Sequence, residues 1–270
     1  MTTSRLVFLD VDGTLLDHQQ QLSPGVVNAV RTARAHGHRI FVCSGRSPAE
    51  VPLAITDIGF DGIISAGGGF TVLDGRLTAA HTLPHDAVDE ITSFFHDHDL
   101  EYNLQAFDAV YPSAGLAARL ATIPAPSGPE AERRAERLVY RAEAPRVGIA
   151  KATFFGERPS TFATVREGLS HRFHVITGTM PQLGSAGGEV SLPGINKGAA
   201  IAALATHLDA NLANVIAIGD SYNDLEMFDV VGVGIAMGNA DDAVKSRAAE
   251  TTGTVQNDGV VEAFRRHGLL

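Results

Sequence analysis

Short apolar runs alternate with helical patterns in this chain of 270 residues, and that alternation limits the possible fold more than any other feature. Apolar runs at residues 6–9, 40–43 and 62–65 are separated by helical patterns at residues 24–36 and 48–56. Runs of this length, bounded by glycine turns, are typical of buried strands. Strand–helix alternation predicts an α/β fold built on a parallel sheet.

The same alternation returns near the C-terminus. An alanine-rich helical pattern at residues 196–207 precedes an apolar run at residues 215–218. A short helix at residues 224–228 and a further strand at residues 233–236 follow. We therefore expect both ends of the chain to build one sheet.

The middle of the chain has a different pattern. Helices are predicted at residues 85–96, 130–143 and 161–170, strands at residues 102–107, 147–155 and 173–177, and a turn-rich stretch at residues 123–129. These segments predict a second, α+β domain inserted into the first. The expected boundaries are residues 1–83 plus 188–270 for the core and residues 84–187 for the insertion.

Composition and charge argue against several classes of function. The chain is 44% hydrophobic and 19% charged, as globular proteins are, and its net charge is −10. An acidic chain repels nucleic acids and anionic membranes, so we expect neither as a partner. Because Cys43 is the one cysteine and no apolar segment resembles a signal peptide or a membrane span, a cytoplasmic protein is expected.

Polar clusters follow the predicted strands or open the predicted helices. They are Asp10-Val11-Asp12-Gly13-Thr14, Ser44-Gly45-Arg46, Asn196-Lys197-Gly198 and Gly219-Asp220-Ser221-Tyr222-Asn223-Asp224. Ligands of open α/β sheets bind outside the carboxyl ends of the strands, so one crevice could collect all of these clusters.

The residue types in these clusters suit phosphate chemistry. Asp10 and Asp12 lie two apart in an extended segment, so their side chains point to the same side. With Asp220 and Asp224 they would place acids in one crevice, which requires a cation, and oxygen ligands favour Mg²⁺. The ammonium group of Lys197 and the hydroxyl group of Ser44 are complementary to a phosphate.

In this order the clusters resemble the motifs of the haloacid dehalogenase superfamily, and more narrowly those of the Cof-type phosphatases. The first motif is Asp10 to Thr14, the second is Ser44 and the third is Lys197. The fourth is matched by Gly219, Asp220, Asn223 and Asp224, and the later stretch Ala236-Met237-Gly238-Asn239-Ala240 is similar as well. One departure is Ala66, which stands where the subfamily usually has asparagine; the glycines after it suggest a loop that allows close backbone approach.

The resemblance implies a Rossmann-like parallel-sheet core with an inserted α+β cap domain of the C2B type that sets substrate specificity. It implies a Mg²⁺-dependent phosphatase that hydrolyses small phosphorylated metabolites, such as sugar phosphates or pyridoxal phosphate, through an aspartyl-phosphate. Asp10 would be the nucleophile and Asp12 the acid and base. The implied metal site consists of Asp10, Asp12, Asp220 and Asp224, and the implied phosphate site of Ser44, Gly45, Lys197 and Asn223.

Other functions are compatible with parts of this pattern. A phosphomutase-like phosphoryl transferase would use the same motifs, and a binding module without turnover would lack Asp10, Asp12 or Lys197, all of which are present. A nucleotide-binding Rossmann module would have Gly-x-Gly-x-x-Gly after the first strand, where this chain has Asp10-Val11-Asp12-Gly13.

Several further polar residues invite a functional interpretation. Cys43 is expected to be buried and inert. Arg46 is of a kind that more often forms a structural ion pair, and a functional role is the alternative. His96 and His98 face different ways on a helix, so a solvated helix end is expected rather than a metal site. In the insertion, four residues could contact a substrate or form ordinary sheet surface: Tyr102, Asn103, Gln105 and Tyr111.

Overall fold

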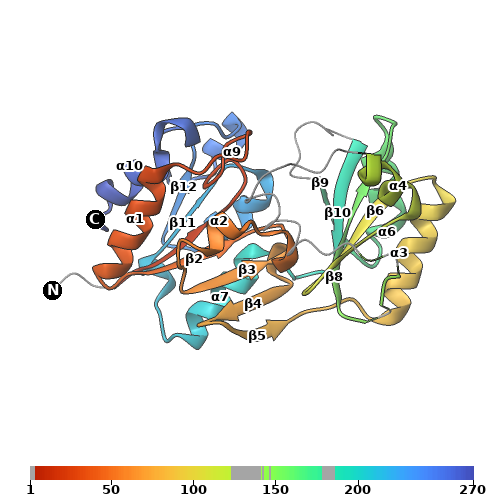
Figure 1. Cartoon of the computed structure of the whole chain (residues 1–270), viewed down its shortest axis with the longest axis horizontal. Helices are drawn as coiled ribbons and strands as arrows, with labels where there is room; N and C mark the ends of the chain where they lie inside the picture. Colours follow the sequence, from red (N-terminus) through yellow and green to blue (C-terminus); the bar gives the residue numbers. More distant parts are fainter. Residues whose placement is uncertain (1–3, 123–140, 142, 146, 178–185) are drawn as a thin grey trace. The chain divides into compact units, whose positions relative to one another are not determined.

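A computed structural model of the chain describes residues 4–122, 141, 143–145, 147–177 and 186–270 (Figure 1). The turn-rich stretch predicted at residues 123–129, and the helix predicted at residues 130–143 except residues 141 and 143, lie outside the described residues. The chain divides into two compact units. The first consists of Met1–Gly45, Ala54–Ala79 and Asn196–Leu270, and the second of Arg46–Leu53 and Ala80–Ile195.

The first unit is built on a sheet with the strand order β13-β12-β11-β1-β2-β3-β4-β5. Its strands are β1 Leu6–Leu9, β2 Arg39–Cys43, β3 Gly62–Ser65, β4 Phe70–Leu73, β5 Arg76–Ala80, β11 Val215–Gly219, β12 Val233–Ala236 and β13 Glu250–Thr251. All neighbours from β13 to β3 are parallel, and β4 joins β3 antiparallel. The predicted α/β core is therefore confirmed.

Helices pack against this sheet with apolar faces. They are α1 Pro24–Ala35, α2 Leu53–Thr56, α7 Lys197–His207, α8 Leu225–Phe228, α9 Asp242–Lys245 and α10 Gly259–Arg266. Ser23 caps α1, since its side chain accepts a hydrogen bond from Gly25 N, and Asn196 caps α7 in the same way. Ile201 and Leu204 of α7 share a buried cluster with Phe8 of β1, which fixes α7 beside the central strands.

The helix predicted at residues 48–56 is wrong in its extent. The structure has a 3₁₀ turn at Pro48–Glu50 and the separate short helix α2 at Leu53–Thr56. Val51 between them is extended, with φ −68° and ψ 120°. Pro52 explains the break, because a proline ring clashes with a helical conformation of the residue before it.

A hairpin of β4 and β5 was not predicted. Asp74 and Gly75 form its turn with φ of 49° and 76°. Positive φ at both central residues matches the right-handed twist of paired strands, and an Asp-Gly pair is a strong signal for such a turn. The hairpin extends the parallel sheet at one edge.

The second unit contains an antiparallel sheet with the order β7-β6-β8-β10-β9. Its strands are β6 Glu101–Ala106, β7 Val110–Pro112, β8 Ile149–Phe155, β9 His174–Thr177 and β10 Gly187–Ser191, and its helices are α3 His85–Asp97, α4 Ala114–Thr122 and α6 Thr161–Leu169. Helices α3 and α6 cover one face of this sheet (Figure 1), where Phe95 and Leu169 join Leu104 in a buried cluster.

The two faces of the second sheet differ in chemistry. Leu104, Ala152 and Val190 are cross-strand neighbours and belong to the apolar cluster under the helices. Side chains alternate along a strand, so the residues on either side of these three point to the opposite face. That face carries Asn103, Gln105, Lys151, Thr153, Glu189 and Ser191.

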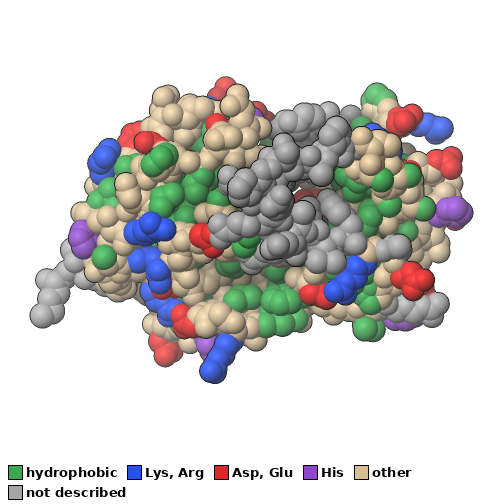
Figure 2. All heavy atoms as spheres, viewed as in Figure 1, with side chains coloured by type: hydrophobic (Ala, Val, Ile, Leu, Met, Phe, Trp, Pro, Cys, Tyr) green, Lys and Arg blue, Asp and Glu red, His purple; other side chains and the backbone are tan. Residues whose placement is uncertain are grey.

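Acidic and basic side chains are interspersed on the face of the molecule shown in Figure 2. Within the first unit, an ion pair connects α1 to β2: Arg34 of α1 donates to both oxygens of Asp61, at 3.0 and 2.9 Å, and Asp61 also accepts from Ile40 N of β2 at 2.8 Å. Among the described residues, no helix has the length and apolar character needed to cross a membrane.

Candidate functional site

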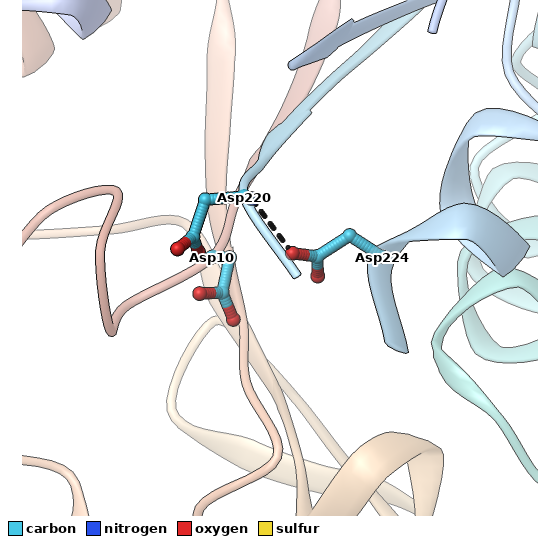
Figure 3. Close-up of side chains that lie close together, drawn as sticks. All are labelled: Asp10, Asp220 and Asp224. Atoms are coloured by element: carbon cyan, nitrogen blue, oxygen red, sulfur yellow. Dashed lines mark hydrogen bonds between the residues drawn. The ribbon is translucent and has the colours of Figure 1, made fainter. Parts of the chain in front are cut away.

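The carboxyl ends of β1 and β11 bring acidic side chains from both ends of the chain together. Asp10 directly follows β1 and Asp220 directly follows β11, its parallel neighbour. Asp10 N donates to Ile218 O at 3.0 Å, so the pairing of the strands extends to the first acidic residue. With Asp224, one carboxylate oxygen from each residue lies within 4.8 Å of the others (Figure 3).

Lys197 is the cation of this cluster. Its side chain is 1% exposed, and Nζ donates to Asp10 Oδ1 and Asp224 Oδ1, each at 2.6 Å. Asn223 Oδ1 accepts from the same nitrogen at 3.4 Å. Burial alone lowers the pKa of Lys197, but the carboxylates of Asp10 and Asp224 raise it well above its ordinary value. The ammonium group therefore keeps its charge.

One lysine does not neutralise the buried carboxylates of Asp10 and Asp224 together with the half-buried carboxylate of Asp220. Burial raises the pKa of Asp10 to about 7; Lys197 opposes this increase, while Asp224 and Asp12 add to it. Burial together with the charges of Asp10 and Asp224 raises the pKa of Asp220 to about 8. Two carboxyl groups with such high pKa values mark a site that favours an added positive charge.

Asp224 is fully engaged by the protein. Its Oδ1 accepts from Lys197, and its Oδ2 accepts from the backbone N–H groups of Asp220 and Ser221, each at 2.9 Å. The side chain thus fixes the turn that carries Asp220 and holds the ammonium group beside Asp10. The structure places Asp224 at the predicted site with both oxygens already hydrogen-bonded.

One carboxylate oxygen of Asp220 has no hydrogen-bond partner. This oxygen, Oδ1, is buried, and the carboxylate of Asp10 contacts Lys197 through its own Oδ1. An unpartnered buried carboxylate oxygen is costly unless a ligand satisfies it. Hard carboxylate oxygens are the ligands that Mg²⁺ prefers, so the residues present fit this cation.

Asp12 lies beside this cluster rather than in it. Its charge contributes to the raised pKa of Asp10, and its Oδ1 accepts from Gln20 Nε2 at 3.1 Å. A bridge between Asp12 and Leu16, and a second between Leu16 and Leu22, fold the following segment back over this loop. Asp12 therefore places a further carboxylate near Asp10.

The predicted phosphate-binding residues occupy the neighbouring strand end. Ser44 directly follows β2 and is 1% exposed. Ser44 N donates to Ile64 O at 2.9 Å, and Ser44 O accepts from Gly67 N at 3.0 Å, so β3 and its loop hold the backbone in place. Gly45 is half-buried beside it, and Asn223 reaches the site through its contact with Lys197.

The glycines after β3 make the close approach that the sequence predicts. An added Cβ at Gly68 would lie 2.4 Å from Asn196 O, the carbonyl that precedes Lys197. Ala66, which stands in place of the usual asparagine, has φ 50° and is 2% exposed. The loop thus supports the N-terminus of α7 with its backbone rather than with a side chain.

Other candidates have structural roles. Cys43 is buried, as expected, and burial raises the pKa of its thiol, which disfavours the reactive thiolate. His96 and His98 are exposed at the end of α3, as expected, and Arg46 Nη1 donates to Glu50 O at 3.2 Å. The exposure of both histidines agrees with the solvated helix end that the sequence predicts.

The four polar candidates of the second unit lie on different faces of its sheet. Tyr102 and Tyr111 pack on the apolar cluster, whereas Asn103 and Gln105 lie on the polar face. Gln105 Nε2 donates to Glu50 Oε2 at 2.6 Å, while Asn103 Oδ1 and Gln105 Oε1 are buried without a partner.

Sequence reasoning missed two polar features. Asn239 donates to both Gly13 O and Asp220, and its only signal was its place in the stretch that resembles the Cof-type phosphatases. Lys151 and Glu189 form a buried ion pair at 2.5 Å in the second unit. They are far apart in sequence, and no local sequence pattern predicts their contact.

Comparisons with known proteins extend over both units. The family model of the haloacid dehalogenase-like hydrolases matches residues 7–264. The 5-amino-6-(5-phospho-D-ribitylamino)uracil phosphatase YcsE of Bacillus subtilis (strain 168) is 28% identical over 269 residues, which cover 98% of this chain and 96% of that protein. The pyridoxal phosphate phosphatase YbhA of Escherichia coli (strain K12) is 26% identical over 278 residues, which cover 98% and 99% of the two chains.

A solved structure shares the fold. A haloacid dehalogenase-like hydrolase from Bacillus subtilis superimposes with a TM-score of 0.81 at 24% sequence identity. The likeness covers 96% of this chain and 98% of that chain. Both the parallel sheet and the inserted antiparallel sheet therefore belong to a known architecture.

Proposed function

This chain belongs to the haloacid dehalogenase-like hydrolases, and on that premise we propose that it is a Mg²⁺-dependent phosphatase of small phosphorylated metabolites. The observation that carries the proposal is the buried Lys197 between Asp10 and Asp224, beside an Asp220 oxygen that has no partner. The relatives named above act on phosphate monoesters of small molecules, which supports the same class of substrate here.

Asp10 is the proposed nucleophile. One of its carboxylate oxygens forms a bond to the phosphorus atom, and the bond from phosphorus to the alcohol oxygen breaks. The product of this step is an aspartyl-phosphate. Lys197, at 2.6 Å from Asp10 Oδ1, holds the carboxylate in place and neutralises negative charge that develops on the transferring group.

Asp12 is the proposed acid and base. It gives its proton to the oxygen of the leaving alcohol, and then removes a proton from the water that hydrolyses the aspartyl-phosphate. Its Oδ1 accepts a hydrogen bond from Gln20 Nε2, and its charge acts on Asp10, as an acid and base beside the nucleophile requires. Inorganic phosphate and the free carboxylate of Asp10 result.

The remaining residues bind the phosphate and the cation. The Ser44 hydroxyl, the Gly45 backbone and Asn223 are proposed to donate hydrogen bonds to phosphate oxygens. Asp10, the Asp12 backbone carbonyl and Asp220 would hold Mg²⁺, with Asp224 at the edge of the site. When bound, Mg²⁺ stabilises the charge of the phosphoryl group. Residues 84–187 are proposed to form the cap that sets specificity, with residues 1–83 and 188–270 as the core, although strand β10 at Gly187–Ser191 belongs to the second sheet and the second unit extends to Ile195.

Removal of the cation tests the proposal directly. Enzyme treated with EDTA is expected to release phosphate more than about 100-fold more slowly than enzyme with Mg²⁺, because the carboxylates then repel the phosphate ester. The measurement is phosphate release from a panel of sugar phosphates, pyridoxal phosphate and other small monoesters. Full activity in EDTA would contradict the metal dependence, and no release from any ester by folded enzyme would contradict the phosphatase, leaving a phosphomutase or a binding module.

Proton release on Mg²⁺ binding is a second expected result. Without metal, Asp10 and Asp220 have pKa values of about 7 and about 8, so both carry protons through much of the range below pH 7. Mg²⁺ requires the ionised oxygens, so its apparent affinity should rise between pH 6 and pH 8, by up to about tenfold per pH unit for each proton released. Titration calorimetry in two buffers of different ionisation enthalpy measures the protons. An affinity that does not change with pH would argue against these carboxylates as ligands.

A further inference from the structure

Asn239 lies in the loop that follows β12, and hydrogen bonds of the backbone hold this loop on both sides. Met237 N donates to Gly219 O, the last residue of β11, at 2.9 Å. Gly238 N donates to Gly253 O, also at 2.9 Å. The backbone around Asn239 is thus fixed relative to the strand that carries Asp220.

The side chain of Asn239 connects three segments. Its Nδ2 donates to Gly13 O at 2.9 Å and to Asp220 Oδ2 at 3.4 Å, and its Oδ1 accepts from Val255 N at 2.9 Å. The Val255 N–H can only donate, so the amide oxygen must face it. The amide nitrogen then necessarily faces Gly13 and Asp220.

These contacts leave one oxygen of the Asp220 carboxylate without a hydrogen-bond partner. Asn239 takes Oδ2, while Oδ1 stays buried without a partner, close to the carboxylates of Asp10 and Asp224. A rotation of the Asp220 carboxylate that exchanged the two oxygens would keep the contact, but a different rotamer would lose it. Asn239 therefore restricts the direction in which Asp220 presents its free oxygen.

The same amide fixes the loop after Asp12. Gly13 has φ +80°, and an added Cβ there would lie 2.1 Å from Asp220 Oδ2, so the backbone of Gly13 packs directly on Asp220. The bond from Asn239 to Gly13 O maintains this approach. Asp12 and Asp220, which follow different strands, are thereby held in register at one site.

We propose that Asn239 is the positioning residue of the cation site: it orients Asp220 and the loop of Asp12 and Gly13 without touching the substrate. The inference rests on the proposed function, because it assumes that Asp10 and Asp220 hold Mg²⁺. Partners that orient a metal ligand commonly contribute about 10- to 100-fold to metal affinity.

The test is the affinity of the full chain for Mg²⁺, measured by calorimetry without substrate. Asn239→Ala is expected to raise the Mg²⁺ dissociation constant by about 10- to 100-fold. The turnover lost at low Mg²⁺ should return at saturating Mg²⁺, which a general loss of structure would not produce. Asn211→Ala is the matched control, because Asn211 likewise accepts a backbone N–H in a loop, from Ala213 at 2.9 Å, at the opposite end of β11.

Asn239→Ser provides the measurement if Asn239→Ala does not fold. The serine hydroxyl retains an acceptor but is too short to replace the amide donor to both partners, so weaker Mg²⁺ binding is expected again. Equal dissociation constants for wild type and the Asn239 variants would overturn the inference and leave the proposed function intact. A wild-type chain that binds no Mg²⁺ would overturn both, so the two failures are distinguishable.

Discussion

Replacement of Asp10 by asparagine is expected to lower phosphate release at least about 10⁴-fold, because the amide cannot form the covalent intermediate. The change is nearly isosteric, and the amide oxygen can still accept the hydrogen bond that Lys197 donates at 2.6 Å. The fold should therefore persist. The measurement is the rate of phosphate release at saturating Mg²⁺ with the best monoester of the panel.

The stability of the metal-free protein supplies a second readout for Asp10→Asn. Burial raises the pKa of Asp10 to about 7 in the folded protein, from 3.8. The folded state thus binds more protons than the unfolded state between these values, and unfolding becomes easier as the pH rises through them. Relative to Asp10→Asn, metal-free wild type should lose stability between pH 4 and pH 7.

Asp74→Asn is the matched control for this experiment. Asp74 is an exposed aspartate in the turn between β4 and β5, paired with Arg39 at 3.1 Å, and asparagine tolerates its φ of 49°. Activity should be unchanged. An Asp10→Asn enzyme that retained more than about a hundredth of wild-type activity would exclude Asp10 as the nucleophile.

The central part of the fold was predictable because its residues are buried on both faces of the sheet. Leu6–Leu9 and Val215–Gly219 are apolar at nearly every position, and the polar residues begin where each strand ends. A polar residue that ends an apolar run lies at a strand terminus, so Asp10 and Asp220 were placed correctly from sequence. Lys197 was predicted to open a helix, and α7 does begin at Lys197.

The hairpin of β4 and β5 carries a strong turn signal that was overlooked, but two other missed features have weak local signals. Strand β10 begins with Gly187 and Gly188, which have low strand propensity, and its buried residue Glu189 interrupts any apolar pattern. The contact of Asn239 with Gly13 joins residues 226 positions apart. Such a contact depends on how several strands pack together. It cannot be predicted from the hydrophobic periodicity of the chain or from the spacing of its residues.

Replacement of Lys151 by methionine is expected to cause the largest loss of stability in the second unit. Lys151 of β8 and Glu189 of β10 have side chains that are 2% and 9% exposed, with Nζ and Oε2 at 2.5 Å. Loss of the lysine leaves the Glu189 carboxylate buried without its counter-charge. Removal of one partner from a buried ion pair typically costs about 3–5 kcal/mol of unfolding free energy.

The double variant Lys151→Met/Glu189→Leu separates this cause from a simple loss of packing. Apolar side chains of similar size bury no charge, so the double variant should recover most of the stability that the single variant loses. Urea unfolding, together with amide hydrogen exchange in β8 and β10, measures the effect within the second unit. Exchange locates the change even where the two units unfold separately.

An exposed ion pair of the same chain is the matched control. Arg247 and Asp229 lie 2.9 Å apart, but their side chains are 54% and 56% exposed. Arg247→Met should cost less than about 1 kcal/mol, because water solvates the remaining carboxylate. If Lys151→Met lowers the unfolding free energy as little as Arg247→Met does, the buried charge of Glu189 does not determine stability on the polar face of the second sheet. The same conclusion follows if the double variant is no more stable than the single one. The contrast between the two pairs thus tests whether desolvation, rather than the number of ion pairs, sets the stability of the second unit.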